Sequence, residues 1–498
     1  MRMFVSLAVL GAVALMPVFP LAAQTPAASP ASAAAAAPPG PNPPAEVPHV
    51  HVRYSFTPVA LHGYTAVSPA EMYNPQRGYG FDLGSKVFMD NKPGSAAGCV
   101  TGVNGKPFFF SVAVPPGIYH VTVTLGSPYA AATTTVKSET RRLQVESLHT
   151  AARSVENCDF LVHIRTPGIP DSAGGGEVKL KQRESDPVLY VRWDPKKPDD
   201  LVPFTELDWD EKLTLAFTGD HPAIDSLEIQ AVPHPTTVYL IGDSTMTDQM
   251  MEPWAAWGQM FPRFFQPTVC VANYAECGET TASFIGEKRW AKVMSEIQPG
   301  DYVFMQFGIN DQMMPVDRFA QYFVKFIDDT RAKGATPVLV TSQNLKRLDA
   351  EGHAVQTLRG FPDAMKKVAE DKHAALIDLN AMSMKFYEAL GPDNLGKAFT
   401  DGTHHSDYGA YELAKCVVQG VKDSGLPLAK AVVADWKPFD PAKPDPLASF
   451  ALPPDVQWDP AFDSPTKTSP AGLGVMAGAA PRGRGGAASQ TRPARGGG

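Results

Sequence analysis

The stretch VYLIGDSTMTDQ, residues 238–249, joins a short apolar run to a glycine, an aspartate and a serine. An apolar run that ends in turn residues is typical of a strand buried on both faces of a parallel sheet. Ligands of such sheets bind outside the carboxyl ends of the strands, and Ser244 stands at that position. Ser244 is therefore either a nucleophile on a sharp turn or a polar residue where a buried strand meets water.

Strand-like and helix-like segments alternate from this stretch to about residue 435. The apolar strands that we expect are TVYLIG (237–242), VCVANY (269–274), DYVFMQFG (301–308), TPVLVTS (336–342) and AALIDL (374–379). The helix-like segments are PWAAWGQMFPRFF (253–265), ASFIGEKRWAKVMSEI (282–297), VDRFAQYFVKFIDDTRAKG (316–334) and TLRGFPDAMKKVAEDKH (357–373). Apolar strands separated by helices of this length indicate an α/β domain, predicted at 235–435, with a parallel sheet covered on both faces.

The preceding region, predicted as a domain at 48–234, alternates with a period of two. PFFFSVAVPPGIYHVTVTLGS (107–127) predicts two strands on either side of Pro-Pro-Gly. The pattern continues in RRLQVESL (141–148), FLVHIRT (160–166), VLYVRW (188–193), KLTLAFTG (212–219) and SLEIQAV (226–232). Several short strands without a convincing amphipathic helix favour an all-β sandwich or jelly roll.

The two ends of the chain differ in composition from these domains. Residues 1–23 are predicted to be a secretory signal, in which Arg2 supplies the charge before an apolar run. A retained membrane anchor is the alternative, which the run disfavours because it is shorter than the ~20 residues that a bilayer needs. The Ala/Pro-rich residues 24–47 predict a flexible linker, 436–465 a Pro-rich extension and 466–498 a Gly/Arg/Ala-rich disordered tail. The chain is therefore predicted to be exported, to the periplasm or the outside, with no membrane span after signal removal.

Charge and cysteine content limit the kinds of partner. The formal net charge of −8 gives no general attraction to nucleic acid or to anionic lipid. An acidic substrate would be met by local cations such as Arg289, Lys346 or Arg347, among which the sequence does not choose. The five cysteines leave at least one without a partner in the chain, and no CxxC pair or close Cys/His cluster suggests a metal site. No metal or other cofactor is predicted, and the oligomeric state is left open.

A catalytic serine needs a base, a group that orients the base and donors for a developing oxyanion. The stretch DGTHHSDYGAYELAKCVVQGV (401–421) places Asp401 and His404 three residues apart on a loop that leads into a helix. Asp401 can then accept from one imidazole nitrogen of His404 while the other nitrogen faces Ser244. His405 is the alternative base, although it would point differently from the same loop.

The oxyanion donors are also expected after strands. VCVANYAECGET (269–280) places Gly278 in a loop where the missing Cβ lets a backbone N–H approach a ligand. In DYVFMQFGIND (301–311) the expected strand ends at Gly308 and is followed by Asn310, whose amide can donate to an oxyanion. Each block alone is ordinary turn chemistry, but their coincidence at three strand ends, together with Asp-x-x-His before the last helix, indicates a catalytic site.

These four blocks resemble those of the SGNH (GDSL-like) hydrolases, named for Ser, Gly, Asn and His. The stretches IGDSTMTDQ, EPWAAWGQMFPRFF, QFGINDQ and DGTHHSDYGA resemble more specifically the rhamnogalacturonan acetylesterases, carbohydrate esterase family twelve. Members with an N-terminal β-sandwich, of the jelly-roll, galactose-binding-like kind, extend the resemblance to most of the ordered chain. The resemblance implies a flavodoxin-like three-layer α/β/α fold and metal-free hydrolysis of acetyl esters on a pectin-type polysaccharide.

The resemblance also implies a role for each block. Ser244 is then the nucleophile, His404 the general base and later acid, and Asp401 its orienting partner. The N–H of Ser244, the N–H of Gly278 and the side chain of Asn310 form the oxyanion hole. The chain departs from the family at Ile309, where relatives often have histidine, and at Gly278-Glu279-Thr280, where many have Gly-Arg-Ser.

Further residues are predicted, less specifically, to contact substrate. Ile309 and Glu279 are expected at the cleft rim, and Trp254 and Trp257 could stack on a sugar ring or could equally be core or interdomain packing. The sandwich domain could bind glycan or could brace the other domain.

Three other interpretations of the chain stay open at this point. Asp401, His404, His405 and Asp407 could form a metal cluster, which the spacing of adjacent histidines disfavours. A lipase, phospholipase or thioesterase could use the same scaffold on a longer acyl chain. A non-catalytic polysaccharide-binding protein would not need the full set of catalytic residues.

Overall fold

The structure is a computed structural model that describes residues 40–43, 46–181, 184, 189–192, 201–204 and 207–453. The predicted signal, most of the predicted linker, the last part of the predicted Pro-rich extension and the predicted tail lie outside the described residues. All of the described residues belong to one compact unit. None of the described helices is long and apolar enough to cross a membrane.

The predicted parallel sheet is present and has five strands. They are β15 (Thr236–Gly242), β16 (Val269–Asn273), β17 (Tyr302–Gln306), β18 (Thr336–Val340) and β19 (Ala375–Ile377). The spatial order is β16-β15-β17-β18-β19, and every pairing is parallel. In chain order this is 2-1-3-4-5, the flavodoxin-like order, in which the switch point lies beside the first strand. The predicted fold class is therefore confirmed.

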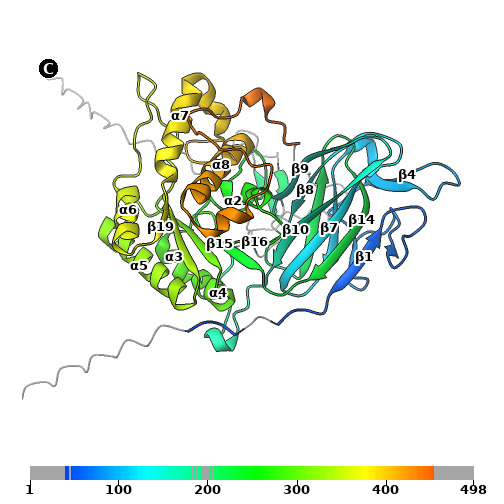
Figure 1. The fold of residues 1–498 in the computed structure, drawn as a ribbon, viewed down its shortest axis with the longest axis horizontal. Helices are drawn as coiled ribbons and strands as arrows, with labels where there is room; N and C mark the ends of the chain where they lie inside the picture. The colour runs from blue at the N-terminus through cyan, green and yellow to red at the C-terminus, as the bar shows by residue number, and fades with distance from the viewer. Residues whose placement is uncertain are drawn as a thin grey trace, which may run out of the picture. The chain divides into compact units, whose positions relative to one another are not determined.

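Alternate residues of each parallel strand pack against opposite helical layers. Val238 and Leu240 of β15 face one core, and Tyr239 and Ile241 face the other. The first core is closed by α2 (Trp257–Met260), α7 (Leu379–Leu395) and α8 (Asp407–Asp423). The second is closed by α3 (Thr281–Gly286), α4 (Arg289–Glu296), α5 (Val316–Ala332) and α6 (Phe361–Asp371). Figure 1 shows the two groups of helices around the sheet.

Three helical segments differ from the sequence prediction. The helix expected at 253–265 is only α2 followed by a 3₁₀ turn, Phe261–Phe264, because Pro262 cannot donate a helical hydrogen bond. The helix expected at 282–297 is divided into α3 and α4 at Lys288, whose φ is +62°. α7 was not expected, since it begins within three residues of β19 and is interrupted at Gly391, where φ is +65°.

The region before residue 235 is built from two antiparallel sheets. One contains β10 (Ser154–Ile164), β7 (Gly117–Ser127), β14 (Ala223–Ala231), β1 (His51–Ser55), β2 (Thr65–Ala66), β4 (Val87–Asn91) and β5 (Gly98–Gly102). The other contains β3 (Tyr79–Asp82), β6 (Phe108–Ala113), β13 (Lys212–Thr218), β8 (Ala132–Ser138) and β9 (Arg142–Thr150). Among the described strands of these two sheets, β1 and β2 are the one pair that runs parallel. A separate two-stranded pair is formed by β11 (Leu189–Arg192) and β12 (Leu201–Phe204).

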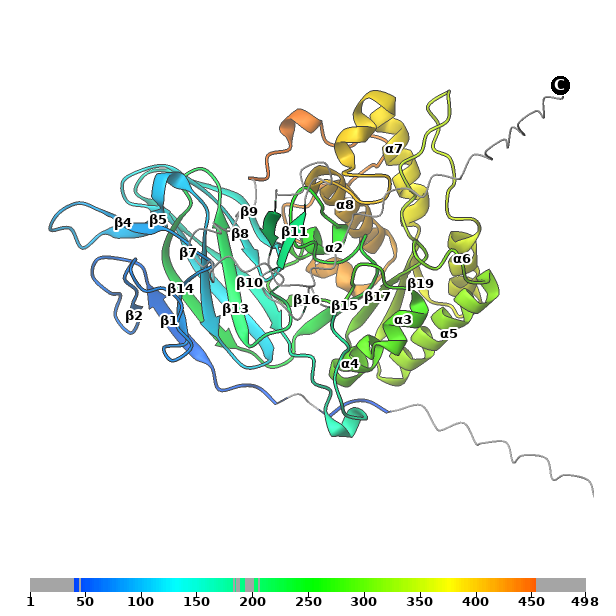
Figure 2. The same ribbon diagram turned by 180° about the vertical axis from the view of Figure 1, so that it is seen from behind.

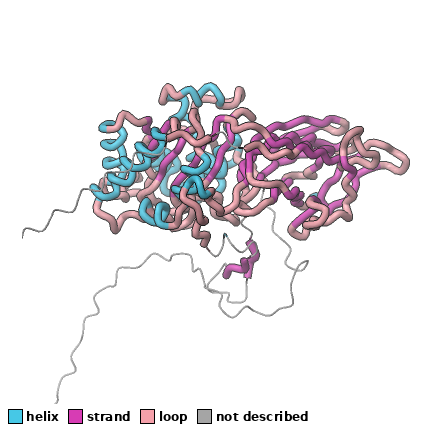
Figure 3. The backbone as a smooth tube through the Cα atoms, turned by 90° about the horizontal axis from the view of Figure 1, so that it is seen from below, coloured by secondary structure: helices cyan, strands magenta, loops and turns pink. Residues whose placement is uncertain are grey.

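The period of two places one face of each sheet in a shared core. Phe108 and Phe110 of β6 pack with Val121 and Val123 of β7 in this core, although the two strands belong to different sheets. The Pro-Pro-Gly stretch at 115–117 therefore carries the chain from one sheet to the other instead of closing a hairpin. Figures 2 and 3 show this part as strands and loops, whereas the helices accompany the parallel sheet.

Candidate active site

Ser244 lies two residues beyond β15, on a turn that hydrogen bonds between its two neighbours, Asp243 and Thr245, hold in place. The buried carboxylate of Asp243 accepts from the backbone N–H of Thr245 (3.0 Å) and from its hydroxyl (2.7 Å). A Cβ at Gly242 would come within 2.6 Å of the backbone oxygen of Gln306, so only glycine fits where the strand passes β17. Ser244 is 5% exposed, so only a small part of the residue is open to solvent.

The loop before α8 brings two predicted residues to this serine. Nε2 of His404 lies 2.8 Å from Oγ of Ser244, and Nδ1 lies 2.8 Å from Oδ2 of Asp401. The other carboxylate oxygen of Asp401 accepts from the backbone N–H of Thr403 and of His404, both at 2.7 Å. Partial burial alone would raise the pKa of Asp401, but the hydrogen bonds and charge of His404 lower it below its ordinary value. The aspartate is thus an ionised partner for the imidazole.

His405 points away from this serine, into the core. It is 1% exposed, its Nε2 lies 2.9 Å from the hydroxyl of Tyr387, and its ring lies 4.2 Å from that of Phe399. Burial, followed by the charge of His404, lowers the pKa of His405 to about 3. The alternative in which His405 is the base is therefore wrong, because its side chain is held by Tyr387 and Phe399.

The two predicted oxyanion residues outside the serine turn follow the strands on either side of β15. Gly278 lies beyond β16 with φ +78°, a conformation that side chains rarely adopt. Asn310 lies beyond β17 and donates from Nδ2 to the backbone oxygen of Glu279 (3.0 Å). This bond uses one of the two amide hydrogens and leaves the other available to a ligand.

Asp311 joins the same two loops more deeply. Its Oδ1 accepts from the backbone N–H (2.9 Å) and hydroxyl (2.7 Å) of Thr281 at the start of α3, and its Oδ2 accepts from the N–H of Gly308 (3.1 Å). The side chain is buried. The loops after β16 and β17 are therefore fixed to each other, which is what a preorganised set of donors requires.

Two of the residues predicted to contact substrate are buried. Trp257 has no exposed surface, and its indole N–H donates to Oε1 of Gln306 (2.7 Å), so it is core packing and not a stacking platform. Glu279 also has no exposed surface and forms an ion pair with Lys181. A buried side chain cannot meet a sugar, so both predictions are wrong. Trp254 and Ile309 are partly exposed and stay predictions.

The three cationic residues that could meet an acidic ligand also differ in burial. Arg289 is 1% exposed and forms a buried ion pair with both oxygens of Glu184, which removes it from solvent. Lys346 and Arg347 are exposed, and the backbone N–H of Lys346 donates to Gly402 O (3.1 Å) beside Asp401. Only these two of the three candidates are available to an acidic ligand.

The metal cluster that was the disfavoured alternative is not assembled among the described residues. Asp407 pairs with Arg141 (3.3 Å) and His405 with Tyr387, so neither faces His404. No group of three or more His, Cys, Asp and Glu side chains is arranged to hold a metal ion in the ranges that the structure describes.

Sequence inspection missed a polar network beneath the serine. Gln306, the last residue of β17, accepts from Trp257 and donates from Nε2 to the hydroxyl of Thr245 (2.7 Å). Nε2 of Gln249 donates to the backbone oxygen of Ser244 (2.5 Å). A glutamine inside an otherwise apolar strand is the one signal in the sequence that could have indicated Gln306.

Comparison with known proteins agrees with this geometry. Residues 240–410 match the model of the GDSL-like lipase/acylhydrolase family. The chain is 39% identical over 221 residues to rhamnogalacturonan acetylesterase RhgT of Bacillus subtilis (strain 168), covering 40% of this chain and 95% of that protein.

The chain belongs to the GDSL-like, or SGNH, hydrolases.

One further relative matches this SGNH hydrolase over most of its length. The uncharacterized esterase YxiM of Bacillus subtilis (strain 168) is 26% identical over 388 residues, covering 73% of this chain and 88% of its own length. The crystal structure of YxiM covers 76% of this chain and 99% of its own, with a TM-score of 0.40 and 23% identity. The match to YxiM is long enough to include residues outside the parallel-sheet region. The SGNH hydrolase is an esterase that resembles the rhamnogalacturonan acetylesterases.

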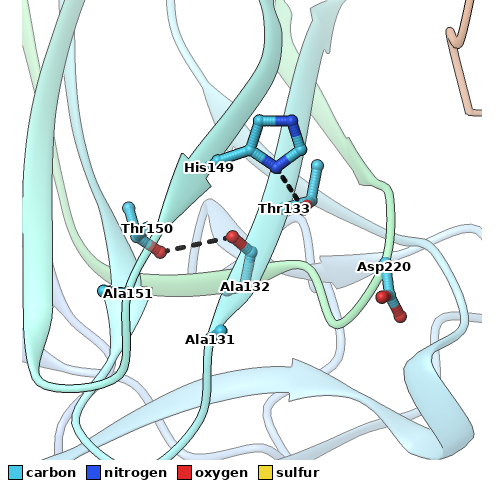
Figure 4. Close-up of a pocket in the computed structure, with 7 residues that line it drawn as sticks. All are labelled: Ala131, Ala132, Thr133, His149, Thr150, Ala151 and Asp220. Atoms are coloured by element: carbon cyan, nitrogen blue, oxygen red, sulfur yellow. Dashed lines mark hydrogen bonds between the residues drawn. The ribbon is translucent and has the colours of Figure 1, made fainter.

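The sandwich of this SGNH hydrolase carries a hollow of its own, away from the catalytic loops. It has a volume of about 220 Å³ and is lined by Ala131, Ala132, Thr133, His149, Thr150, Ala151 and Asp220. Figure 4 shows Nδ1 of His149 bonded to the hydroxyl of Thr133, at 2.8 Å. This bond occupies two of the few polar side chains that line the hollow.

Asp243 makes the stability of this SGNH hydrolase depend on pH. Burial raises the pKa of Asp243 to about 6, above the ~3.9 of an unfolded aspartate, and Oδ2 has no hydrogen-bond partner among the described residues. The folded state holds this proton more tightly, so its contribution is fully present below about pH 4 and is lost as the pH rises toward 6.

Asp243→Asn is expected to remove this loss of folding stability at higher pH, because an amide keeps the Oδ1 acceptor and cannot ionise. The free energy of unfolding of the variant minus that of the wild type should rise by about 1–3 kcal/mol between pH 4 and pH 8. Urea unfolding at both values measures it, with exposed Asp363→Asn as the matched control. A difference that is equal at pH 4 and pH 8 contradicts the prediction.

Proposed function

We propose that this SGNH hydrolase is an exported serine esterase that removes acetyl groups from a plant cell-wall polysaccharide, and that its substrate is rhamnogalacturonan. The observation that carries the chemistry is the chain of hydrogen bonds from Ser244 through His404 to Asp401. The polysaccharide is supported by relatives named as rhamnogalacturonan acetylesterases, of which the chain covers nearly the full length. Export is supported by the composition of the first 23 residues.

In the proposed mechanism, Oγ of Ser244 attacks the acetyl carbonyl carbon while Nε2 of His404 takes the hydroxyl proton. Asp401 holds the imidazole in the required tautomer and stabilises the imidazolium. The N–H of Ser244, the N–H of Gly278 and the amide of Asn310 would receive the negative charge on the carbonyl oxygen.

Collapse of this intermediate breaks the bond between the acetyl carbon and the sugar oxygen. His404 returns its proton to the departing sugar oxygen, which leaves an acetyl-serine. Water then attacks the acetyl-serine with His404 again as base, and acetate leaves as Ser244 recovers its proton. No step requires a metal ion or other cofactor.

Acetate release from a panel of acetylated polymers tests the proposal. We expect the wild type to deacetylate rhamnogalacturonan at least ~10-fold faster, in kcat/KM, than acetylated xylan or mannan. The chemically deacetylated polymer is the blank. Equal rates on all three polymers would leave an acetylesterase but overturn the rhamnogalacturonan assignment.

The same enzyme should be assayed on p-nitrophenyl acetate and on p-nitrophenyl esters of longer acyl chains. Faster turnover of the long esters would favour a lipase or thioesterase, since a long chain requires an apolar groove. Retention of the polysaccharide without any acetate release would favour a binding protein.

A further inference from the structure

The turn between β8 and β9 carries two arginines from the sandwich to the loops of the parallel sheet. It consists of residues 138–142, Ser-Glu-Thr-Arg-Arg. Glu139 has φ +51° and Arg141 has φ +63°, which non-glycine residues adopt only at a cost of about 1–3 kcal/mol. Figure 1 shows β9 near α2, and the two elements contact each other. Such conformations persist where the surroundings hold them in place, here the groups that surround Arg141.

Arg141 makes three polar contacts with the parallel-sheet region. Its Nη1 donates to the backbone oxygens of Gln249 (3.0 Å) and Trp254 (2.7 Å), and its Nη2 lies 3.3 Å from Oδ1 of Asp407. The side chain is only 10% exposed. The guanidinium therefore joins the loop that follows the nucleophile turn to the helix that follows the histidine loop.

Two of these contacts continue to a member of the proposed catalytic set, and the third leads to a residue that follows the histidine loop in sequence. Gln249 donates from its side chain to the backbone oxygen of Ser244 (2.5 Å). The indole N–H of Trp254 lies 3.4 Å from Oδ2 of Asp401, the same oxygen that faces His404. Asp407, the first residue of α8, is three residues beyond His404. A single residue, Gln249 or Trp254, therefore connects Arg141 with Ser244 or with Asp401. Asp407 connects it with the helix that follows the histidine loop.

An arginine fits this position for a chemical reason. Its planar guanidinium has donors that point in fixed directions, so one side chain can bind two carbonyl oxygens and a carboxylate at the same time. A lysine ammonium would keep the charge opposite Asp407 but could not hold the same three acceptors with the same geometry.

We propose that Arg141 is a positioning residue for the esterase reaction, and that the sandwich thereby completes the catalytic site instead of serving only as an appended module. The inference rests on the proposed function, since it assumes that Ser244, His404 and Asp401 do the chemistry. Arg141 acts through Gln249, Trp254 and Asp407 and touches no reacting atom.

The same interface offers a matched control. Glu146 of β9 accepts from Nε of Arg263 (2.9 Å) and from the hydroxyl of Tyr411 (2.7 Å). This is also a charged, partly buried contact from the sandwich to the parallel-sheet region, but it reaches the 3₁₀ turn after α2 and the second turn of α8. Neighbouring Arg142 is not a suitable test, because it is buried against Asp208 and Asp248. Its loss would leave Asp208 with only the longer ion pair to Arg165 (3.9 Å) and would remove the cation that faces Asp248.

Arg141→Met and Glu146→Met in the full chain separate positioning from bracing. We expect Arg141→Met to lower kcat for acetate release from p-nitrophenyl acetate ~10- to 100-fold with KM changed less than ~3-fold, because displaced catalytic groups slow the chemical steps. Glu146→Met should lower the melting temperature and leave kcat within ~2-fold of wild type. Assays run well below each melting temperature, so that the folded fraction does not enter kcat. Arg141→Lys should recover part of the lost kcat.

A double-mutant cycle with Asp407→Asn gives the second test. The losses in kcat from Arg141→Met and Asp407→Asn should combine to less than their product, because both remove the same link. The proposal is overturned if kcat of Arg141→Met matches that of Glu146→Met, or if the two losses multiply. Ser244→Ala distinguishes failure of this proposal from failure of the proposed function. If Ser244→Ala is inactive but Arg141→Met behaves like Glu146→Met, only the role of Arg141 is withdrawn.

Discussion

Ser244→Ala is expected to lower the rate of acetate release by at least ~10⁴-fold, because it removes the group that attacks the ester carbon. The fold should remain, since the hydroxyl has one described partner, His404, and the Asp243–Thr245 bonds that hold the turn do not use it. Acetate release under single-turnover conditions and thermal unfolding, measured on the same preparation, check both parts.

Ser295→Ala is the matched control for this substitution. Its hydroxyl donates to the backbone oxygen of Lys292 within α4, outside the loops that carry Ser244, Gly278, Asn310 and His404. It should retain wild-type turnover. Near-normal acetate release by Ser244→Ala would mean that the nucleophile lies elsewhere, and the proposed mechanism would then be abandoned.

His404→Asn and His405→Gln are expected to fail in different ways, although the residues are adjacent. His404→Asn should lower kcat at least ~10³-fold, because the base that takes the serine proton is lost. His405→Gln should act mainly on stability, by about 1–3 kcal/mol, since His405 bonds Tyr387 and packs on Phe399 inside the core.

The measurement is kcat alongside the urea midpoint for both variants. Gln at 405 can still bond the hydroxyl of Tyr387, which makes it the mildest replacement of that buried ring. If His405→Gln loses more kcat than His404→Asn, the assignment of the base to His404 is wrong.

The sandwich and the parallel-sheet region are more closely connected than their separate sequence patterns indicate. The buried ion pairs of Arg142 with Asp208 and Asp248 unite residues from both regions. Asp248 also accepts from Asn273 (2.8 Å), at the end of β16. The pair of Arg142 and Asp248 is buried where the two regions meet. Removal of the sandwich would therefore expose Asp248 without its arginine.

The candidate catalytic blocks could be found in the sequence because each is local. A strand that ends in Gly-Asp-Ser and a histidine three residues after an aspartate are short-range patterns, and parallel strands bring such blocks to one edge of the sheet. The same logic failed for Trp257 and Glu279. Their neighbours in sequence lie at the site, but the direction of each side chain depends on what packs against it.

The sequence by itself determined the two kinds of fold, the strand ends that carry polar residues and the candidate triad of Ser244, Asp401 and His404. Periodicity and motif spacing are properties of residues that are close in the chain. Only the tertiary structure decided that His404 and not His405 faces the serine, that Arg289 is buried, and that Arg141 reaches Gln249, Trp254 and Asp407. The contacts of Arg141 join residues more than 100 positions apart. No local pattern encodes them, because they depend on how β9 packs against α2 and on which polar groups that packing removes from water.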